Sequence, residues 1–183
     1  TARGVQAVEI TLRHIADEHR RGVLSSLTPE ALQAYLRDQS IGLAQIQGLA
    51  MHDGNGDALA LSWLAPRTRS NIAHFDAFRA ARDNRDAGVW LGAAVRSPSD
   101  DEWMIPIGRR LEAPEGAFAG TIGARLRIEY FTDFYRDIKL EAGTKVTLMH
   151  HDGTLLARYP LLDGAVGKRF ESSSRQALAE PRA

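Results

Sequence analysis

Hydrophobic side chains at the start of the chain recur with the spacing of one helix face. Apolar residues fall three or four positions apart, and polar residues fill most positions between them. The stripe consists of Val5, Val8, Leu12, Ile15 and His19. This spacing predicts an amphipathic helix over 5–19 and also matches a coiled-coil heptad. Because the pattern is in register from the first residues and no capping residue precedes it, we expect the helix to continue upstream.

Further helices and several strands follow this stripe. A second helix is predicted over 26–40, because Thr28 suits the N-cap and Pro29 suits the first helical position. Helical spacing returns at 70–84 and 128–138. Strand-like runs separated by Gly- and Asp-containing turns fill much of the remainder. The predicted strand and hairpin segments are 46–64, 88–95, 102–111, 118–127 and 144–161.

The order of these elements indicates the fold class. Consecutive hairpins are typical of an antiparallel sheet with helices packed on it, an α+β arrangement. A doubly wound parallel sheet would instead alternate strand and helix throughout. A chain of 183 residues is expected to form one main domain with helical additions. We expect an N-terminal helical segment at 1–40, a sheet domain at 41–165 and a C-terminal connector at 166–183.

Composition narrows the function classes. The chain is 44% hydrophobic and 25% charged, with a net charge of zero, so strong attraction to nucleic acid is not expected. The absence of cysteine excludes disulfides, thiolate catalysis and cysteine-ligated zinc. No stretch approaches the roughly 20 apolar residues of a membrane-spanning helix. A membrane anchor is therefore not expected within this chain.

No catalytic or metal-binding motif stands out. The chain lacks a G-x-S-x-G elbow, an H-E-x-x-H motif and a G-x-G-x-x-G loop after a strand. His150 and His151 are adjacent on a predicted strand, so they would point to opposite faces and could not easily share a metal. We therefore expect no enzymatic activity, no cofactor and no metal site.

The hairpin at 102–127 combines cationic and small side chains. Its arginines are Arg109, Arg110, Arg125 and Arg127. Small residues beside the last two arginines leave space above the sheet, where guanidinium groups could bind an anion such as a carboxylate. The alternative interpretation is an ordinary solvated face. A register shift of one residue would exchange the two faces, so the sequence leaves open which arginines point inward.

Aromatic residues lie close to these arginines in the predicted fold. Trp90 and Trp103 are expected on strands, and Phe78 and Tyr130 are expected on neighbouring helices. Together they could enclose a small ligand. They could equally be ordinary core residues.

Three segments occur in an order that resembles the Cache-type, PAS-like sensor domain. They are "FRAARDN", "WMIPIGRRLEAPEGAFAGTIGARLRIEYFTDFYRDI" and "VTLMHHDGTLLARYP". The resemblance covers about residues 40–165. It implies an extracytoplasmic, periplasmic module of a membrane receptor such as a diguanylate cyclase or a histidine kinase. It also implies a long N-terminal helix along a curved antiparallel sheet, with a small ligand bound on the other face under helices and loops.

The chain departs from the family pattern before and after the hairpin. In relatives, a segment reading Asp-Arg-x-Tyr-Phe is followed by a histidine. Only Phe78 matches here, and the other positions are His74, Phe75, Ala77 and Ala81. Arg127 stands where relatives often have an acidic residue. The amino-acid-binding signature of some double-Cache sensors is therefore not supported, and the ligand could be a different, anionic molecule.

We predict a ligand-binding sensor domain that relays a population shift through its terminal helices. The predicted ligand-binding residues are Phe78, Trp90, Trp103, Arg109, Arg125 and Arg127, with Tyr130 as a further candidate. The expected partners are a small-molecule ligand and a second copy of the chain, with a membrane anchor elsewhere in the full-length protein. The alternative is a degenerate module with a closed pocket, which would dimerise through the stripe at 5–19.

Overall fold

A computed structural model describes residues 2–63, 69–85, 88–97, 101–137, 144–162 and 164–171. Most of the predicted connector at 166–183 lies outside these ranges. The chain forms two compact units. The main unit comprises residues 2–91 and 106–126, and the C-terminal unit comprises residues 92–105 and the chain from residue 127 onward. Most of the main sheet and both N-terminal helices belong to the main unit.

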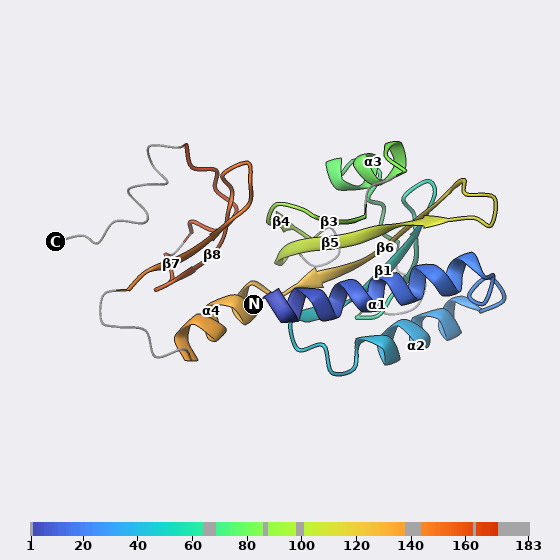
Figure 1. Cartoon of the computed structure of the whole chain (residues 1–183), viewed down its shortest axis with the longest axis horizontal. Helices are drawn as coiled ribbons and strands as arrows, with labels where there is room; N and C mark the ends of the chain where they lie inside the picture. Colours follow the sequence, from blue (N-terminus) through green and yellow to red (C-terminus); the bar gives the residue numbers. More distant parts are fainter. Residues whose placement is uncertain are drawn as a thin grey trace. The chain divides into compact units, whose positions relative to one another are not determined.

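The helices and strands follow one another as the sequence predicts, with differences in length (Figure 1). The helices are α1 (Ala2–Arg20), α2 (Pro29–Ser40), α3 (Asp76–Asp83) and α4 (Ile128–Asp137). The strands are β1 (Ile46–Asp53), β2 (Ala58–Leu61), β3 (Val89–Leu91), β4 (Val95–Arg96), β5 (Trp103–Glu112), β6 (Phe118–Leu126), β7 (Val146–Met149) and β8 (Leu155–Tyr159).

The strands of the main sheet run in the order β2-β1-β6-β5-β3, with β4 beside β5. The pairs β1–β2, β1–β6, β3–β5 and β4–β5 are antiparallel. A separate antiparallel pair, β7-β8, lies in the C-terminal unit. The N-terminal helices α1 and α2 lie on one side of the main sheet, and α3 lies on the other (Figure 1). The predicted α+β class, with a long helix along an antiparallel sheet, is confirmed.

The helix α1 uses the predicted stripe to pack against the sheet. Val8, Leu12 and Ile15 are 0% exposed, and α1 packs against β6. The tyrosine hydroxyl of Tyr35 on α2 donates to Glu18 on α1, and burial raises the pKa of Tyr35 above its usual range. Because this chain's own sheet buries Val8, Leu12 and Ile15, these three side chains are not exposed to a second copy, and the dimer through the stripe at 5–19 stays a prediction.

Two predicted elements are shorter than expected. The helix expected over 70–84 begins only at Asp76, because Asn71 instead ties the chain to the β1–β2 turn. The amide Nδ2 of Asn71 donates to Asp57 Oδ1 at 2.8 Å, and its Oδ1 accepts from the backbone N–H of Ala73 at 2.9 Å. The strand expected over 88–95 is interrupted and forms the two short strands β3 and β4.

The sheet has one apolar face and one face of small and polar residues. On β1 and β6, the apolar face carries Leu49, Met51, Ile122, Ala124 and Leu126, all buried. Since the buried stripe of α1 is apolar, this is the face that α1 covers. Directly paired residues of an antiparallel sheet share a face. The opposite face therefore carries Gly48 with Arg125, Ala50 with Gly123, and His52 with Thr121.

The C-terminal unit has a core of its own. The strand β8 is buried at Leu155, Leu156 and Ala157, and α4 packs against it. The predicted turn at Asp152-Gly153 is confirmed, since the Asp152 carboxylate accepts from the backbone N–H of Thr154 at 2.8 Å. This hydrogen bond is the main reason why the pKa of Asp152 lies well below its usual range. A contact with His150 lowers the pKa further. The residues therefore form a turn, as the sequence indicates.

Candidate ligand-binding face

Glycines along the polar face of the main sheet allow two indole rings to lie directly on the strands. A Cβ at Gly108 would lie 2.4 Å from Cζ2 of Trp90, which is paired opposite it on β3. A Cβ at Gly48 would lie 2.6 Å from Cε3 of Trp63. At such distances an added side chain would require the indole ring to move. The two tryptophans thus lie against the strands in space that only glycine leaves open.

Arg125 is a buried cation of this face. The residue is 4% exposed, and it pairs opposite Gly48 on β1. Its guanidinium carbon lies 4.8 Å from the ring centroid of Trp63, which is the geometry of a cation–π contact. An arginine keeps its charge when buried, so its donors remain suited to a carboxylate. Arg125 and Trp63 are the strongest combination for ligand binding in the main unit.

Trp90, on β3, adds a hydrogen-bond donor to the main sheet. Its Nε1 is buried and has no hydrogen-bond partner among the residues that the structure describes. A buried indole N–H is normally paired, because leaving it unpaired costs free energy. A ligand with an acceptor atom could satisfy this group.

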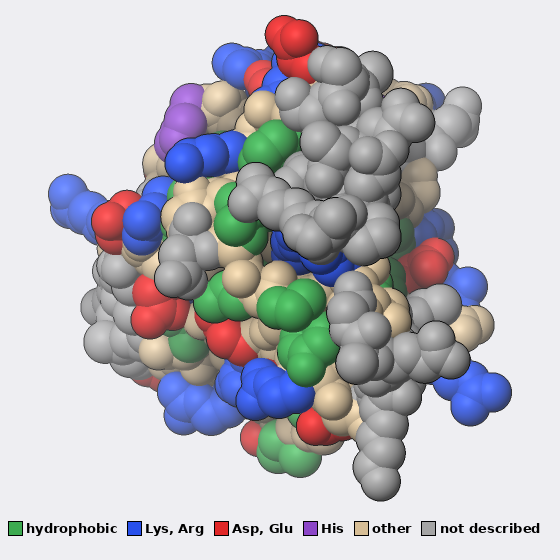
Figure 2. Space-filling view, turned by 90° about the vertical axis from the view of Figure 1, so that its left-hand side faces the viewer, with side chains coloured by type: hydrophobic (Ala, Val, Ile, Leu, Met, Phe, Trp, Pro, Cys, Tyr) green, Lys and Arg blue, Asp and Glu red, His purple; other side chains and the backbone are tan. Residues whose placement is uncertain are grey.

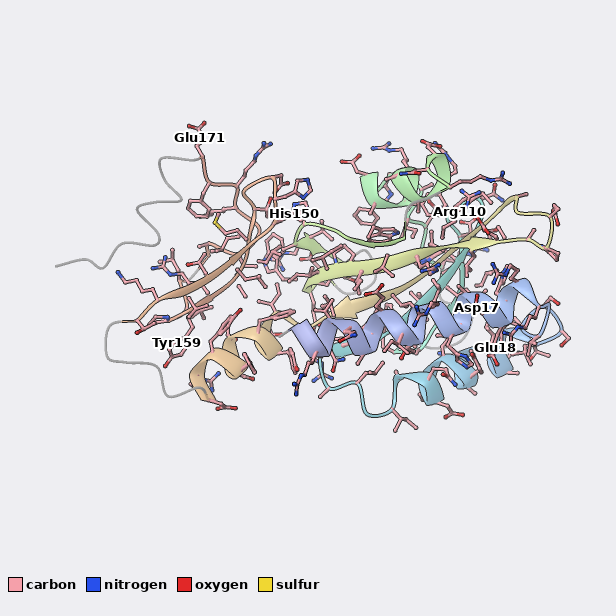
Figure 3. All side chains as sticks on the ribbon, in the orientation of Figure 1. Asp17, Glu18, Arg110, His150, Tyr159 and Glu171 are labelled. Atoms are coloured by element: carbon pink, nitrogen blue, oxygen red, sulfur yellow. The ribbon has the colours of Figure 1, made fainter. Side chains whose placement is uncertain are left out.

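Arg110 is the second buried arginine, and its contacts are internal. Its Nη1 donates to the backbone carbonyls of Ala81 at 3.0 Å and Arg82 at 2.7 Å, and its guanidinium lies 4.8 Å from the Phe118 ring. Figure 3 shows Arg110 extending from the sheet toward α3. The sequence pairs Arg109 with Arg110 and cannot tell them apart. By strand alternation Arg109 points to the opposite face, and its predicted ligand contact stays a prediction.

Phe78 occupies the core beneath α3. It is 1% exposed and meets Phe118 edge-on, with ring centroids 5.5 Å apart. This packing explains why the residue is present whether or not it also touches a ligand. Its role at the site stays a prediction.

The other predicted site residues belong to the C-terminal unit. Trp103 lies against Gly167, where an added Cβ would be 2.1 Å from Cη2 of the indole ring. The guanidinium carbon of Arg96 lies 4.8 Å from the centroid of the same ring. Arg127 is exposed just after β6. Tyr130 on α4 meets Phe131 edge-on at 5.6 Å. These residues form no group with Arg125 within the main unit, and their ligand contacts remain predictions.

Sequence reasoning did not select Trp63, His52 or Thr121 as site residues. The sequence predicts Trp63 on a strand, among the aromatic residues that could enclose a ligand, but it follows β2, and only the folded structure places Gly48 beneath it. His52 and Thr121 are 6% and 2% exposed and pair opposite each other. Strand alternation from Arg125 back to Thr121 was the available signal. Alternation along β6 could not identify His52, because His52 lies on β1 and only the pairing of β1 with β6 places it opposite Thr121.

His52 is a neutral histidine in the folded protein. Burial lowers its pKa from 6.5 to about 4, although the neighbouring Asp53 and Asp57 act in the opposite direction. Its imidazole thus excludes a proton over a pH range in which the unfolded chain binds one. The folded state is therefore expected to lose stability as the pH falls.

The free energy of unfolding should decrease between pH 6.5 and about 4, because the unfolded state binds more protons there. The loss attributable to His52 should reach about 3 kcal/mol below this range. Urea denaturation across the range measures it, and His52→Gln should flatten the profile. His151→Gln, which alters an exposed histidine, is the control and should leave the profile unchanged. An unchanged slope in His52→Gln would contradict the assignment.

The described residues supply neither a metal site nor a membrane-spanning helix. They contain no group of three His, Cys, Asp or Glu side chains able to hold a metal ion. No helix within the described ranges is long and apolar enough to cross a membrane. The face seen in Figure 2 mixes basic, acidic and hydrophobic side chains, so the visible described residues form no large patch of one sign. The ligand-binding face above remains the leading candidate site.

The fold and this face define the class of the protein: it has the architecture of bacterial extracellular sensor domains. The extracellular domain of a proposed histidine kinase, rpHK1S-Z16, matches with a TM-score of 0.82 and 26% identity, over 92% of this chain and 67% of that one. An extracellular ligand-binding receptor from Desulfohalobium retbaense matches with a TM-score of 0.76 and 13% identity, over 97% and 32%. The predicted likeness to Cache-type sensor domains is confirmed.

A third solved structure extends the likeness to chemoreceptors. It is the ligand-binding domain of the Pseudomonas fluorescens chemoreceptor CtaA in complex with L-serine, with a TM-score of 0.63 and 15% identity, over 96% of this chain and 70% of that one. No protein-family model matches the chain, and no curated protein matches it. The chain spans about two thirds of the extracellular domain of the histidine kinase and one third of the D. retbaense receptor. These neighbours are sensor or receptor domains, and none is described as catalytic.

Proposed function

We propose that the chain is the ligand-binding part of a membrane receptor on the periplasmic side of the inner membrane, and that it binds a small molecule bearing a carboxylate. The observation that carries the proposal is the buried guanidinium of Arg125 stacked on Trp63 above Gly48. Structural neighbours support it, since several are ligand-binding domains in complex with amino acids. The output would be a histidine kinase or a diguanylate cyclase, and the receptor would act as a homodimer.

Charge and shape together determine the ligand class. A guanidinium offers paired N–H donors that match the two oxygens of a carboxylate. Indole rings provide apolar walls for a short side chain or hydrocarbon segment. The residues at 74–81 do not match the amino-acid-binding pattern of some Cache sensors, which favours simple organic acids. Amino acids stay candidates because structural neighbours bind them.

A thermal-shift panel tests the proposal. The probes are the L-amino acids and short mono- and dicarboxylates, each with its methyl ester or amide as a control that lacks the carboxylate. A saturating ligand at a hundred times its Kd should add about 2.7 kcal/mol of stability. For a chain of this length the midpoint should rise by about 5–10 °C. The esters and amides should give much smaller shifts.

A structural or dimerisation module is the second candidate. It is favoured by the close packing of Trp90 on Gly108, which fills space directly above the strands. This candidate predicts no shift with any probe and a concentration-dependent midpoint if the chain dimerises. A shift shared equally by acids and esters would also count against the carboxylate proposal.

A further inference from the structure

The end of the β5–β6 hairpin is attached to α3 by side chains from both partners. Arg110 on β5 donates to the carbonyls of Ala81 and Arg82, and Arg85 just after α3 donates through Nη2 to the Gly116 carbonyl at 2.8 Å. The last carbonyls of a helix have no intrahelical partner and carry partial negative charge. Arg110 therefore supplies the donors and the positive charge that the C-terminal end of α3 requires.

The same hairpin is attached to α1. The ring nitrogen Nδ1 of His19, in the last turn of α1, lies 3.3 Å from the backbone carbonyl of Glu112. Because a carbonyl only accepts, this nitrogen is the donor in the hydrogen bond. The carboxylate Oε1 of Glu112 in turn lies 3.4 Å from Nε of Arg110. Arg110 thus contacts α3, Glu112 contacts α1, and the two residues of β5 contact each other.

The burial of Arg110 shows that these contacts matter to the fold. The residue is 8% exposed, and a guanidinium withdrawn from water destabilises the protein unless charges and hydrogen bonds compensate. The compensation comes from α3, from Glu112 and from the ring of Phe118. If α3 moved away, Arg110 would lose two of its acceptors. The position of α3 and the conformation of this part of β5 are therefore energetically linked.

We propose that Arg110 and Glu112 couple α3 to the last turn of α1. Arg110 is a positioning residue, and it acts on a ligand only through α3. This proposal rests on the proposed function insofar as α3 lies on the ligand-binding side of the sheet. Ligand binding that stabilises α3 would stabilise the end of α1, and by linkage a displacement of α1 would change ligand affinity by the same factor.

Amide hydrogen exchange on the unliganded protein tests the coupling from the α1 side. His19→Gln weakens one hydrogen bond at the end of α1 and touches nothing on α3. Loss of a hydrogen bond of ordinary strength should speed exchange on the order of fivefold. The proposal predicts faster exchange in α3 as well as in the last turn of α1. Faster exchange confined to α1 would overturn it.

The control is His14→Gln, the same substitution on the same helix. His14 Nε2 lies 3.7 Å from Glu18 Oε1, and its side chain is half exposed. It should leave exchange in α3 unchanged. If His14→Gln accelerated α3 as much as His19→Gln does, the effect would be general loosening of α1, and the proposal would fail.

A second pair of variants tests the coupling from the hairpin. Arg110→Met keeps a side chain over Phe118 and removes the donors, whereas Arg79→Met alters an exposed arginine of α3 that pairs with Asp76. Only Arg110→Met should accelerate exchange in both α3 and the last turn of α1, while β7–β8 keeps its protection. If the Arg110→Met protein does not fold, the exchange rates of α3 in His19→Gln still test the coupling.

These measurements need no ligand. A negative thermal-shift panel would therefore defeat the proposed function and leave the coupling standing, whereas exchange confined to α1 would defeat only the coupling.

Discussion

Replacing Gly120 by alanine should lower the free energy of unfolding by at least about 3 kcal/mol, a large loss for the addition of one methyl group. The φ angle of Gly120 is +133°, a backbone conformation that is essentially restricted to glycine. An added Cβ would also lie 2.0 Å from the carbonyl oxygen of His52 on β1. Backbone strain and a clash with backbone atoms act together here, so β6 could keep its pairing with β1 only by shifting.

Two other glycines separate strain from clash in the same urea-denaturation experiment. Gly42 has a φ of +83° with no heavy atom within 4 Å of an added Cβ, so Gly42→Ala tests strain alone and should cost about 1 kcal/mol. Gly88 has neither feature, and Gly88→Ala should change stability by less than about 0.5 kcal/mol. Equal losses for Gly120→Ala and Gly42→Ala would mean that β6 does not pass as close to β1 as described.

Arg125→Met should weaken binding of the best carboxylate ligand on the order of a hundredfold, since removing one member of a buried charged hydrogen-bonded pair typically costs 2–5 kcal/mol. Methionine retains an unbranched apolar side chain that can pack on Trp63. Titration calorimetry with the strongest probe from the thermal-shift panel measures the change. Arg125→Lys keeps a positive charge without the paired donors and should lose part of the affinity.

The matched control for this experiment is Arg13→Met, which removes an exposed arginine from α1. It should leave ligand affinity within a factor of about two, because exposed substitutions away from a site have small effects. An unchanged affinity in Arg125→Met, with a folded protein, would show that the ligand binds elsewhere.

The local elements of the fold could be predicted because their signals are local. Thr28 accepts a hydrogen bond from the backbone N–H of Ala31 at 3.2 Å, as expected of the predicted N-cap, and the heptad-like stripe is buried along α1. The turn at Asp152-Gly153 likewise follows from two adjacent residues. Such features depend on a few neighbours in sequence, so pattern alone is sufficient to find them.

The orientation of the arginines could not be predicted because it depends on long-range pairing. Arg109 and Arg110 are sequence neighbours with opposite environments, and only the contact with α3 explains why Arg110 is the buried one. Arg125 is a candidate from its small neighbours alone, and its ligand contact stays a prediction, whereas its packing on Trp63 requires the register of β1 with β6. The two buried arginines of the hairpin therefore differ in their contacts: Arg110 donates to the end of α3, and Arg125 lies against Trp63.

The shortened α3 has a similar cause. The spacing of apolar residues over 70–84 is helical, yet Asn71 hydrogen bonds to the β1–β2 turn in place of starting a helix. A side-chain amide that satisfies several distant groups can override a weak helical preference. The sequence contains no signal for this contact, because its partners lie about fifteen residues away.

The most direct test of the central claim is a titration followed by the NMR signals of the three indole N–H groups. Trp63 and Trp90 lie on the proposed face of the main unit, and Trp103 lies in the C-terminal unit. Binding of a carboxylate at Arg125 predicts saturable shifts of the Trp63 and Trp90 signals in wild-type protein that disappear in Arg125→Met. A ligand that stabilises the protein while moving only the Trp103 signal would contradict the account.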